Sequence, residues 1–261
     1  MTAPELAPSP FNLPEVRRVP VSRPFRWLRK GWADFDAGSA FYGVCFALMG
    51  GAIQFVFREA PHYASSLAMG FLLVGPFLAI GLYDLSRQKE MRGAARLLSS
   101  LTAWRANPGA IGVYVLILTV IFLVWARASL VTFALFHHQG LPDLATLVAQ
   151  LVRGENFVLI LAWLGVGAVF AALVFALSVV SIPFLLDARA EAVTAAAASV
   201  LALARNPLAM FIWAALIATL TVAALAAFHV GLIIVAPVIG HATWHAYRDV
   251  IGPRTEAAGG A

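Results

Sequence analysis

A long stretch without charged side chains, residues 207–247, constrains this chain more than any other feature. It runs from Pro207 to Tyr247 without a single Asp, Glu, Lys or Arg. One helix needs only about 20 apolar residues to cross a bilayer, so this stretch is long enough for two. The stretch therefore predicts two consecutive membrane-spanning helices that are joined by a very short turn.

The composition extends this prediction to the whole chain. Hydrophobic residues make up 61% of it and charged residues 12%, whereas a soluble domain carries about 25% charged residues. Within lipid, only helices and closed barrels pair all of their backbone polar groups. Barrel strands alternate apolar and polar residues over short segments, but the apolar runs of this chain are continuous. We therefore expect an all-α fold, a polytopic membrane helix bundle.

Six apolar runs are predicted to span the membrane within one domain, residues 25–250. They cover residues 39–57, 63–83, 110–130, 157–185, 208–228 and 231–247. The Pro-rich residues 1–24 have no helical period and are predicted to form a disordered tail, and residues 251–261 a flexible one. Apolar residues recur at helical spacing within residues 84–107, which predicts a short amphipathic helix on the cytoplasmic membrane surface. A second short helix is expected before residue 206.

The distribution of positive charge predicts the orientation. Of the 18 Lys and Arg residues, all but Arg58, Arg127 and Arg153 fall on one side of the six predicted spans. Lys and Arg accumulate on the cytoplasmic side of membrane proteins. Both termini are therefore predicted to be cytoplasmic.

Aromatic and basic residues alternate just before the first predicted span. This segment contains Arg26, Trp27, Arg29, Lys30 and Trp32. Such a segment is typical of the headgroup region, where the rings face the membrane and the cations meet lipid phosphate. We expect it to bind lipid or a protein partner rather than nucleic acid, because a membrane helix follows at once.

The end of the last apolar run carries the strongest candidates for chemistry. Trp244 and Arg248 are expected to join the lipid- or partner-binding set. His241, His245 and Asp249 are spaced to share one helix face. Two such histidines can bind Zn, Cu or haem iron, with the carboxylate as a third ligand. Polar residues at a membrane surface more often make structural hydrogen bonds, so no cofactor and no catalytic residue are expected.

An internal repeat relates two parts of the chain. Pro76 and Pro183 each precede a polar segment that ends in Asn-Pro, at Asn107 and at Asn206. We expect each Asn to cap the helix that its Pro begins. Both copies place Asn-Pro on the same side, so the repeat is parallel. It favours a scaffold grown by duplication, with a small transporter or channel as the alternative.

The motifs at both ends of the domain resemble those of a known family. They are Arg26-Trp27-Leu28 with Gly31-Trp32, and Pro237 followed by His241 and Trp244-His245. This is an uncharacterised group of proteobacterial integral membrane proteins, sometimes labelled cytochrome c oxidase subunit I-like. The resemblance implies a six-helix protein of the bacterial inner membrane without an established activity. Haem–copper catalysis is not supported, because the six histidines lie near both predicted surfaces.

Three functional hypotheses follow. The leading one is a non-enzymatic accessory, assembly or scaffold protein that acts through protein or lipid contacts. Its partners would be the lipid bilayer and a respiratory or other inner-membrane complex. The first alternative is the small transporter or channel. The second is a metal- or haem-binding protein that uses His241 and His245.

Overall fold

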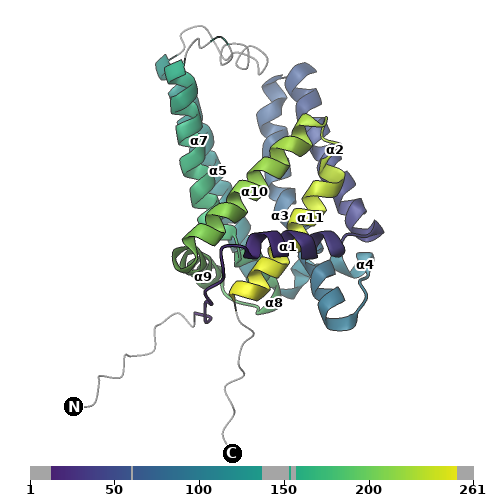
Figure 1. Ribbon diagram of the computed structural model, residues 1–261. Coiled ribbons are helices and arrows are strands. Elements are labelled where there is room, and N and C mark those ends of the chain that lie inside the picture. The colour runs from purple at the N-terminus through teal and green to yellow at the C-terminus, as the bar shows by residue number, and fades with distance from the viewer. Residues whose placement is uncertain (1–12, 60, 137–152, 154–156, 252–261) are drawn as a thin grey trace, which may run out of the picture. The chain divides into compact units, whose positions relative to one another are not determined.

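The computed structural model describes residues 13–59, 61–136, 153 and 157–251. These residues form helices and one isolated antiparallel bridge, between Val16 and Ile251 (Figure 1). The all-α membrane bundle is therefore confirmed. The helices are α1 (Arg23–Ala33), α2 (Ala37–Glu59), α3 (Pro61–Arg92), α4 (Leu97–Ser100), η1 (Ala103–Ala106), α5 (Pro108–Phe136), α7 (Phe157–Ser178), α8 (Ser181–Asp187), α9 (Ala192–Arg205), α10 (Pro207–Ala226) and α11 (Leu232–Val250).

Within the described residues, four helical segments are long and apolar enough to cross a membrane. They are Ala37–Val56, Pro108–Thr132, Phe157–Asp187 and Pro207–Ala226, and they overlap the first, third, fourth and fifth predicted spans. The two remaining predicted spans fall in α3 and α11, which are helices of 32 and 19 residues. The total of six spans therefore stays a prediction.

The chain divides into two compact units. The first comprises residues 1–115 and 177–261, and the second comprises residues 116–176. The second unit holds most of α5 and α7. Its Phe122 and Trp125 rings lie 5.3 Å apart. All of the candidate site residues lie in the first unit.

Helix α11 forms the centre of the first unit, where it packs against α1, α2 and α3. Two glycines allow its backbone to come this close. A side-chain carbon on Gly43 of α2 would lie 2.0 Å from the carbonyl oxygen of Ile233, and one on Gly31 of α1 would lie 2.5 Å from that of Val238. No side chain fits at such distances, so glycine is required where α11 crosses these helices.

The amphipathic helix predicted within residues 84–107 is not a single helix. Helix α3 instead continues to Arg92 and ends at Gly93, whose φ of 72° is left-handed. A left-handed glycine after the last helical residue is a common helix terminator. The short helices α4 and η1 follow, and Tyr42 Oη lies 2.8 Å from Ser100 Oγ, which fastens α4 to α2.

The predicted tail over residues 1–24 is wrong for residues 16–24. Val16 is buried and pairs with Ile251, and the Arg17 amide donates to Val250 O at 2.8 Å. Helix α1 then begins at Arg23. The end of α11 and the side chains of Arg205 and Asn206 pair with backbone groups of this segment, so it is held in place where composition alone predicted disorder. Residues 1–12 and 252–261 lie outside the described part.

The two Asn-Pro motifs begin α5 and α10 as expected, but the Asn side chains form hydrogen bonds with other segments of the chain. Asn206 makes no side-chain cap to α10; it accepts from the Val19 amide at 2.7 Å and donates to Arg17 O at 3.0 Å. Asn107 donates to Leu185 O at 3.2 Å and to Ala190 O. The capping prediction is therefore wrong for Asn206, whose amide fastens the N-terminal segment instead.

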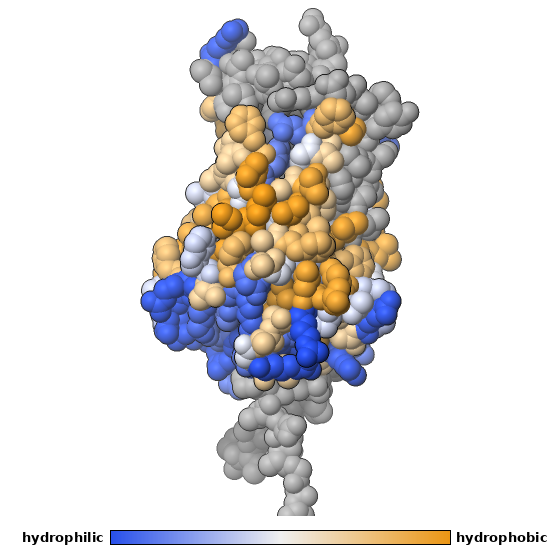
Figure 2. Space-filling view, turned by 90° about the vertical axis from the view of Figure 1, so that its right-hand side faces the viewer, coloured by the Kyte–Doolittle hydropathy of each residue, from blue (hydrophilic) through white to orange (hydrophobic). Residues whose placement is uncertain are grey.

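Figure 2 shows how polarity is distributed over one face of the molecule. Hydrophobic side chains form a broad band, and hydrophilic side chains gather beyond it at one end. In the first unit, α1, α4 and α8 lie at this end, which we call the polar end (Figure 1). The candidate site lies there.

Candidate functional site

Helix α1 lies across α11 and α10 at the polar end (Figure 1). Pro24, Trp27 and Gly31 recur at helical spacing on its buried face. The Trp27 side chain is 0% exposed and its ring meets the edge of Trp213 at 5.9 Å. Its indole nitrogen donates to Oδ2 of Asp249 at 2.8 Å, and Arg23 pairs with the same oxygen at 3.0 Å. These contacts fix α1 to the end of α11.

The expectation that Trp27 and Trp244 face lipid or a partner is wrong, because both rings are inside the protein. Trp244 is 1% exposed and its indole nitrogen donates to Glu90 at 2.9 Å. Arg248 pairs with the same carboxylate at 3.1 Å and lies 3.5 Å from Asp187. A buried indole N–H needs a polar partner, and acidic residues of other helices supply one in both cases.

The other members of that predicted set lie on the outer face of α1. Arg26, Arg29 and Lys30 are exposed, and their side chains make no ion pair within the described chain. Trp32 is 62% exposed and stacks on Phe35 at 6.4 Å. The helix therefore presents three exposed cations and a solvent-facing aromatic from a fixed backbone.

An apolar groove runs beside these cations, between α1, α10 and α11. Its volume is about 380 Å³. The lining comprises Phe25, Leu28, Arg29, Trp32, Leu220, Ile234, Val235 and Val238. Arg29 is the charged member of this lining, so the groove combines a hydrophobic floor with one cation at its side.

A buried polar network lies behind α1, where α2, α3 and α11 meet. His241 of α11 is 0% exposed. Its Nε2 lies 2.7 Å from Ser39 Oγ of α2, and its Nδ1 lies 2.7 Å from Ser86 Oγ of α3. Both ring nitrogens therefore have a hydroxyl partner, which is what a buried imidazole needs.

Two carboxylates of the α1–α2 junction complete this network. Ser86 donates to Asp34 Oδ2 at 2.7 Å, and His245 Nε2 lies 2.9 Å from the same oxygen. Ser39 Oγ lies 2.8 Å from Asp36 Oδ1. The Lys89 ammonium pairs with Asp36 Oδ2 at 2.9 Å and donates to the backbone carbonyl of Asp34. The network thus closes on itself and connects four helices.

The hydrogen bonds also shift the acidity of both carboxyl groups. Burial alone would raise the pKa of Asp34, but hydrogen bonds from His245 and Ser86 outweigh it and lower the pKa. Burial alone would also raise the pKa of Asp36, but the hydrogen bonds from Lys89 and Ser39 outweigh it and lower the pKa. Donors to the charged form stabilise it. Both groups are therefore ionised partners of the network at neutral pH.

The predicted metal ligands share one face of α11, as their spacing indicates, but they do not converge on one point. His241 contacts the two serines, His245 faces Asp34, and Asp249 is held by Arg23 and Trp27. In the part of the chain that the structure describes, no group of three or more His, Cys, Asp or Glu could hold a metal ion. The face of α11 is a row of hydrogen-bonding positions for α1, α2 and α3.

Sequence reasoning missed five members of the network. They are Asp34, Asp36, Ser39, Ser86 and Lys89. Their types are ordinary for a helix end, and those that meet His241 or His245 lie more than 150 positions away in the sequence. The available signal was weak: two carboxylates and a serine close to the start of the first predicted span.

The fold and the network define an integral membrane protein made of helices, in which a basic N-terminal helix is fixed to the last helix. A family model described as "Predicted integral membrane protein (DUF2189)" matches residues 64–187 of the chain. Over this region the chain is similar to that family of unknown function, which confirms the resemblance seen in the sequence. No curated protein and no solved structure matches the chain. Helices α1 and α11 lie outside the matched residues.

Proposed function

We propose that this protein is a non-enzymatic scaffold or accessory protein that binds anionic phospholipid headgroups through α1. The observation that carries this proposal is the outer face of α1. It presents Arg26, Arg29 and Lys30, which have no ion-pair partner among the described residues, beside the exposed Trp32 and the apolar groove. Cations, an interfacial aromatic and a hydrophobic floor together suit the boundary between headgroups and acyl chains.

The magnitude of the electrostatic term is sufficient for preferential binding. Each Lys or Arg near an anionic membrane surface contributes about 1 kcal/mol, so three contribute roughly 3 kcal/mol. The three cationic side chains project from a helix that Trp27 and Gly31 already hold against α11. Helix α1 is therefore already ordered before a ligand binds, so the affinity is not reduced by the entropic cost of ordering it.

The groove supports a lipid rather than a soluble anion as the ligand. Phe25 and Trp32 are both exposed beside it, and Arg29 forms part of its wall. Arginine can lie against apolar surface with its stem and keep its guanidinium in the polar layer. A phospholipid whose acyl chain occupies the groove would therefore place its phosphate near Arg29.

The predicted orientation is part of this proposal. The excess of Lys and Arg on one side supports a cytoplasmic location for α1 at the bacterial inner membrane, where anionic lipids attract basic segments. A respiratory or other membrane complex would then be recruited through the same surface or through the helix faces. The transporter and the metal- or haem-binding hypotheses remain predictions.

Native mass spectrometry of the full-length protein tests the proposal. The protein, released from mild detergent, is titrated with phosphatidylglycerol and with phosphatidylcholine. The variant R26Q/R29Q/K30Q should lose at least about tenfold in affinity for phosphatidylglycerol, because about 1.4 kcal/mol corresponds to tenfold. A matched variant that removes three other exposed cations, R18Q/R105Q/R153Q, should keep most of its affinity.

Two outcomes would contradict the proposal. One is equal binding of the anionic and the zwitterionic lipid by the wild-type protein. The other is an equal loss in both triple variants, which would show a response to net charge alone. If the α1 variant instead loses a stoichiometric protein partner from native membranes with its lipid binding intact, α1 is a protein-docking helix.

A further inference from the structure

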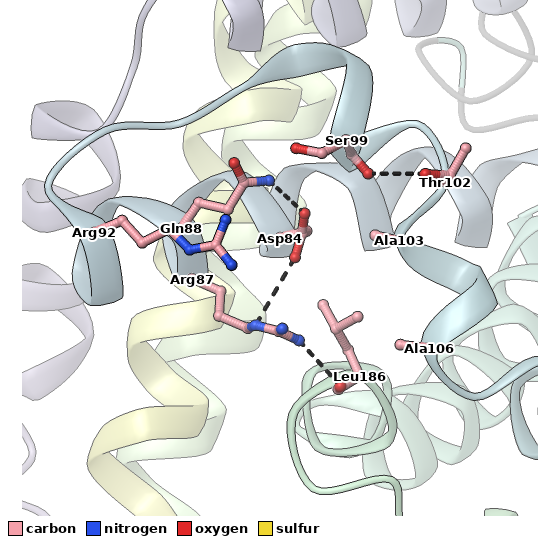
Figure 3. A pocket seen from close by; sticks show the side chains of 9 residues that line it. All are labelled: Asp84, Arg87, Gln88, Arg92, Ser99, Thr102, Ala103, Ala106 and Leu186. Carbon is pink, nitrogen blue, oxygen red and sulfur yellow. Dashed lines mark hydrogen bonds and ion pairs between the residues drawn. The ribbon is translucent and has the colours of Figure 1, made fainter.

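A second cavity, separate from the groove, lies at the polar end between α3, the α4–η1 segment and α8 (Figure 3). Its volume is about 220 Å³. Asp84, Arg87, Gln88 and Arg92 of α3 line it on one side, and Ser99 and Thr102 line it on the other. It shares no lining residue with the groove beside α1. It is therefore an independent candidate for ligand binding.

The charges that line this cavity do not balance. Asp84 is buried, accepts a hydrogen bond from Gln88 and lies 3.8 Å from Nε of Arg87. Arg87 also donates to Leu186 O at 3.3 Å, so this pair is internally compensated. Arg92 has no ion pair within the described chain. One positive charge is left over at the cavity.

The leftover charge belongs to a group well suited to phosphate. A guanidinium presents a planar fork of N–H donors that matches two phosphate oxygens at once. In Figure 3, Arg87 and Arg92 both extend from α3 beside Asp84, and Ser99 and Thr102 lie across from them. The two hydroxyls donate to backbone carbonyls, at 2.9 and 3.2 Å, and keep lone pairs for a ligand's hydroxyl groups.

We propose that this cavity binds an organic phosphate through Arg92, with Arg87 as the second cation. A phosphodiester carries a single negative charge, which matches the single uncompensated charge of the lining. The cavity offers the volume of about seven water molecules, at about 30 Å³ each, which accommodates a phosphate with a small polar substituent. The ligand class is therefore a phosphodiester with a hydroxylated headgroup.

Such a group can come from a phospholipid or from a soluble phosphate ester. Apolar side chains beside the cavity favour the lipid. Leu98 of α4 is 81% exposed, and Leu101 is also exposed. Trp104, which follows the lining residue Ala103 in the sequence, meets Phe77 in an edge-to-face contact at 6.1 Å. Acyl chains would cover this apolar surface while the phosphate enters the cavity.

Binding of two probes to the full-length protein in detergent tests the proposal. One probe is phosphatidylglycerol, and the other is glycerophosphoglycerol, which has the same headgroup without acyl chains. The variant R92Q should weaken binding by at least about tenfold. R96Q removes a neighbouring cation that does not line the cavity, and it should bind like the wild type.

A second variant separates the cavity from its charge. A103L places extra carbons on a lining residue and should block the site without changing the net charge. Binding of both probes supports a phosphate site for either source, whereas binding of the lipid alone assigns it to lipid. The residues changed in the variant R26Q/R29Q/K30Q do not line this cavity. Lipid binding that persists in this variant and is lost on the further substitution R92Q therefore reports on the cavity alone.

The proposal is overturned if R92Q and R96Q weaken binding equally, if A103L has no effect, or if neither probe binds to the wild type. Among the described residues Arg92 makes no ion pair that its replacement would break, so R92Q should unfold at the wild-type temperature. That measurement, made in the same detergent, confirms that a loss of binding is not a loss of fold.

Discussion

The indole nitrogen of Trp27 donates to Oδ2 of Asp249 at 2.8 Å, across 222 positions of sequence. Arg23 pairs with the same oxygen, so one carboxylate holds both the beginning and the middle of α1. This contact explains why the exposed cations of α1 sit on a fixed helix. It also makes Asp249 the residue whose loss should free α1.

Replacement of Asp249 by Ala should destabilise the protein by about 1–3 kcal/mol, because a fully buried indole N–H loses its acceptor. Thermal unfolding in detergent measures this. The substitution W27F removes the indole N–H itself, so no buried donor is left unpaired, and it leaves the ion pair between Arg23 and Asp249. W27F should therefore destabilise the protein less than D249A. A larger loss in W27F than in D249A would show that ring packing against Trp213, not the hydrogen bond, holds α1.

Two glycines of α2 should respond in opposite ways to alanine. In G43A the new carbon would lie 2.0 Å from Ile233 O, so α11 has to move and the unfolding temperature should fall. In G51A nothing lies within 4 Å, and alanine is the better helix former by about 1 kcal/mol. The G51A variant should therefore be as stable as the wild type or more so. Equal effects in both variants would contradict the close approach of α2 and α11.

Acid should loosen the α1–α2 junction. The pKa of Asp34 and that of Asp36 are both lowered from the usual 3.8. A lowered carboxyl pKa contributes stability that is present above the unfolded-state value and is lost as pH falls through the folded-state value. The unfolding temperature should therefore drop as the pH falls below about 4. The double variant D34N/D36N should be less stable at neutral pH and should show a smaller drop. An unchanged pH profile would remove these carboxylates from the stability of the junction.

The protonation of His241 follows from counting hydrogens. Ser39 and Ser86 each have one hydroxyl hydrogen, and each hydroxyl lies within hydrogen-bond distance of both a carboxylate and the imidazole. A neutral ring supplies a single N–H, so one serine must turn its hydrogen toward His241. Asp36 keeps Lys89 and the Ser39 amide if Ser39 turns, so Ser39 is the better candidate.

We therefore expect a neutral His241 with its proton on Nδ1, since a fully buried charge is costly. Nitrogen-15 NMR of the imidazole distinguishes this tautomer from the Nε2 form and from the imidazolium. In S39A the ring loses the donor to Nε2, whereas in S86A it loses the acceptor for Nδ1–H. The resonance should change its tautomer in S86A and not in S39A. A doubly protonated ring in the wild type would contradict this assignment of hydrogens.

Local sequence patterns predicted the elements of this fold well. The apolar runs became helices, and Pro108 and Pro207 begin α5 and α10. The i, i+4, i+8 spacing of His241, His245 and Asp249 placed them on one face of α11. These features depend on residues within a few turns of each other, which is why they can be read without a structure.

Partners across the sequence could not be predicted in this way. Trp27 and Trp244 have the composition of interfacial residues, and only their contacts with Asp249 and Glu90 show that they are buried. Helix α3 ends at Gly93, whereas the apolar periodicity around this residue predicted a separate, short amphipathic helix within residues 84–107. In each case a tertiary contact or a single backbone conformation overrode a correct local preference.

The distance between Trp27 and Asp249 along the chain has a consequence for biosynthesis. At about 5–20 residues per second, the ribosome needs on the order of ten seconds or more to make the segment between them. Until α11 has been synthesised, α1 lacks the carboxylate and the helix backbone that fix it. The surface formed by α1 is thus the last part of the first unit to be assembled, although it is encoded first.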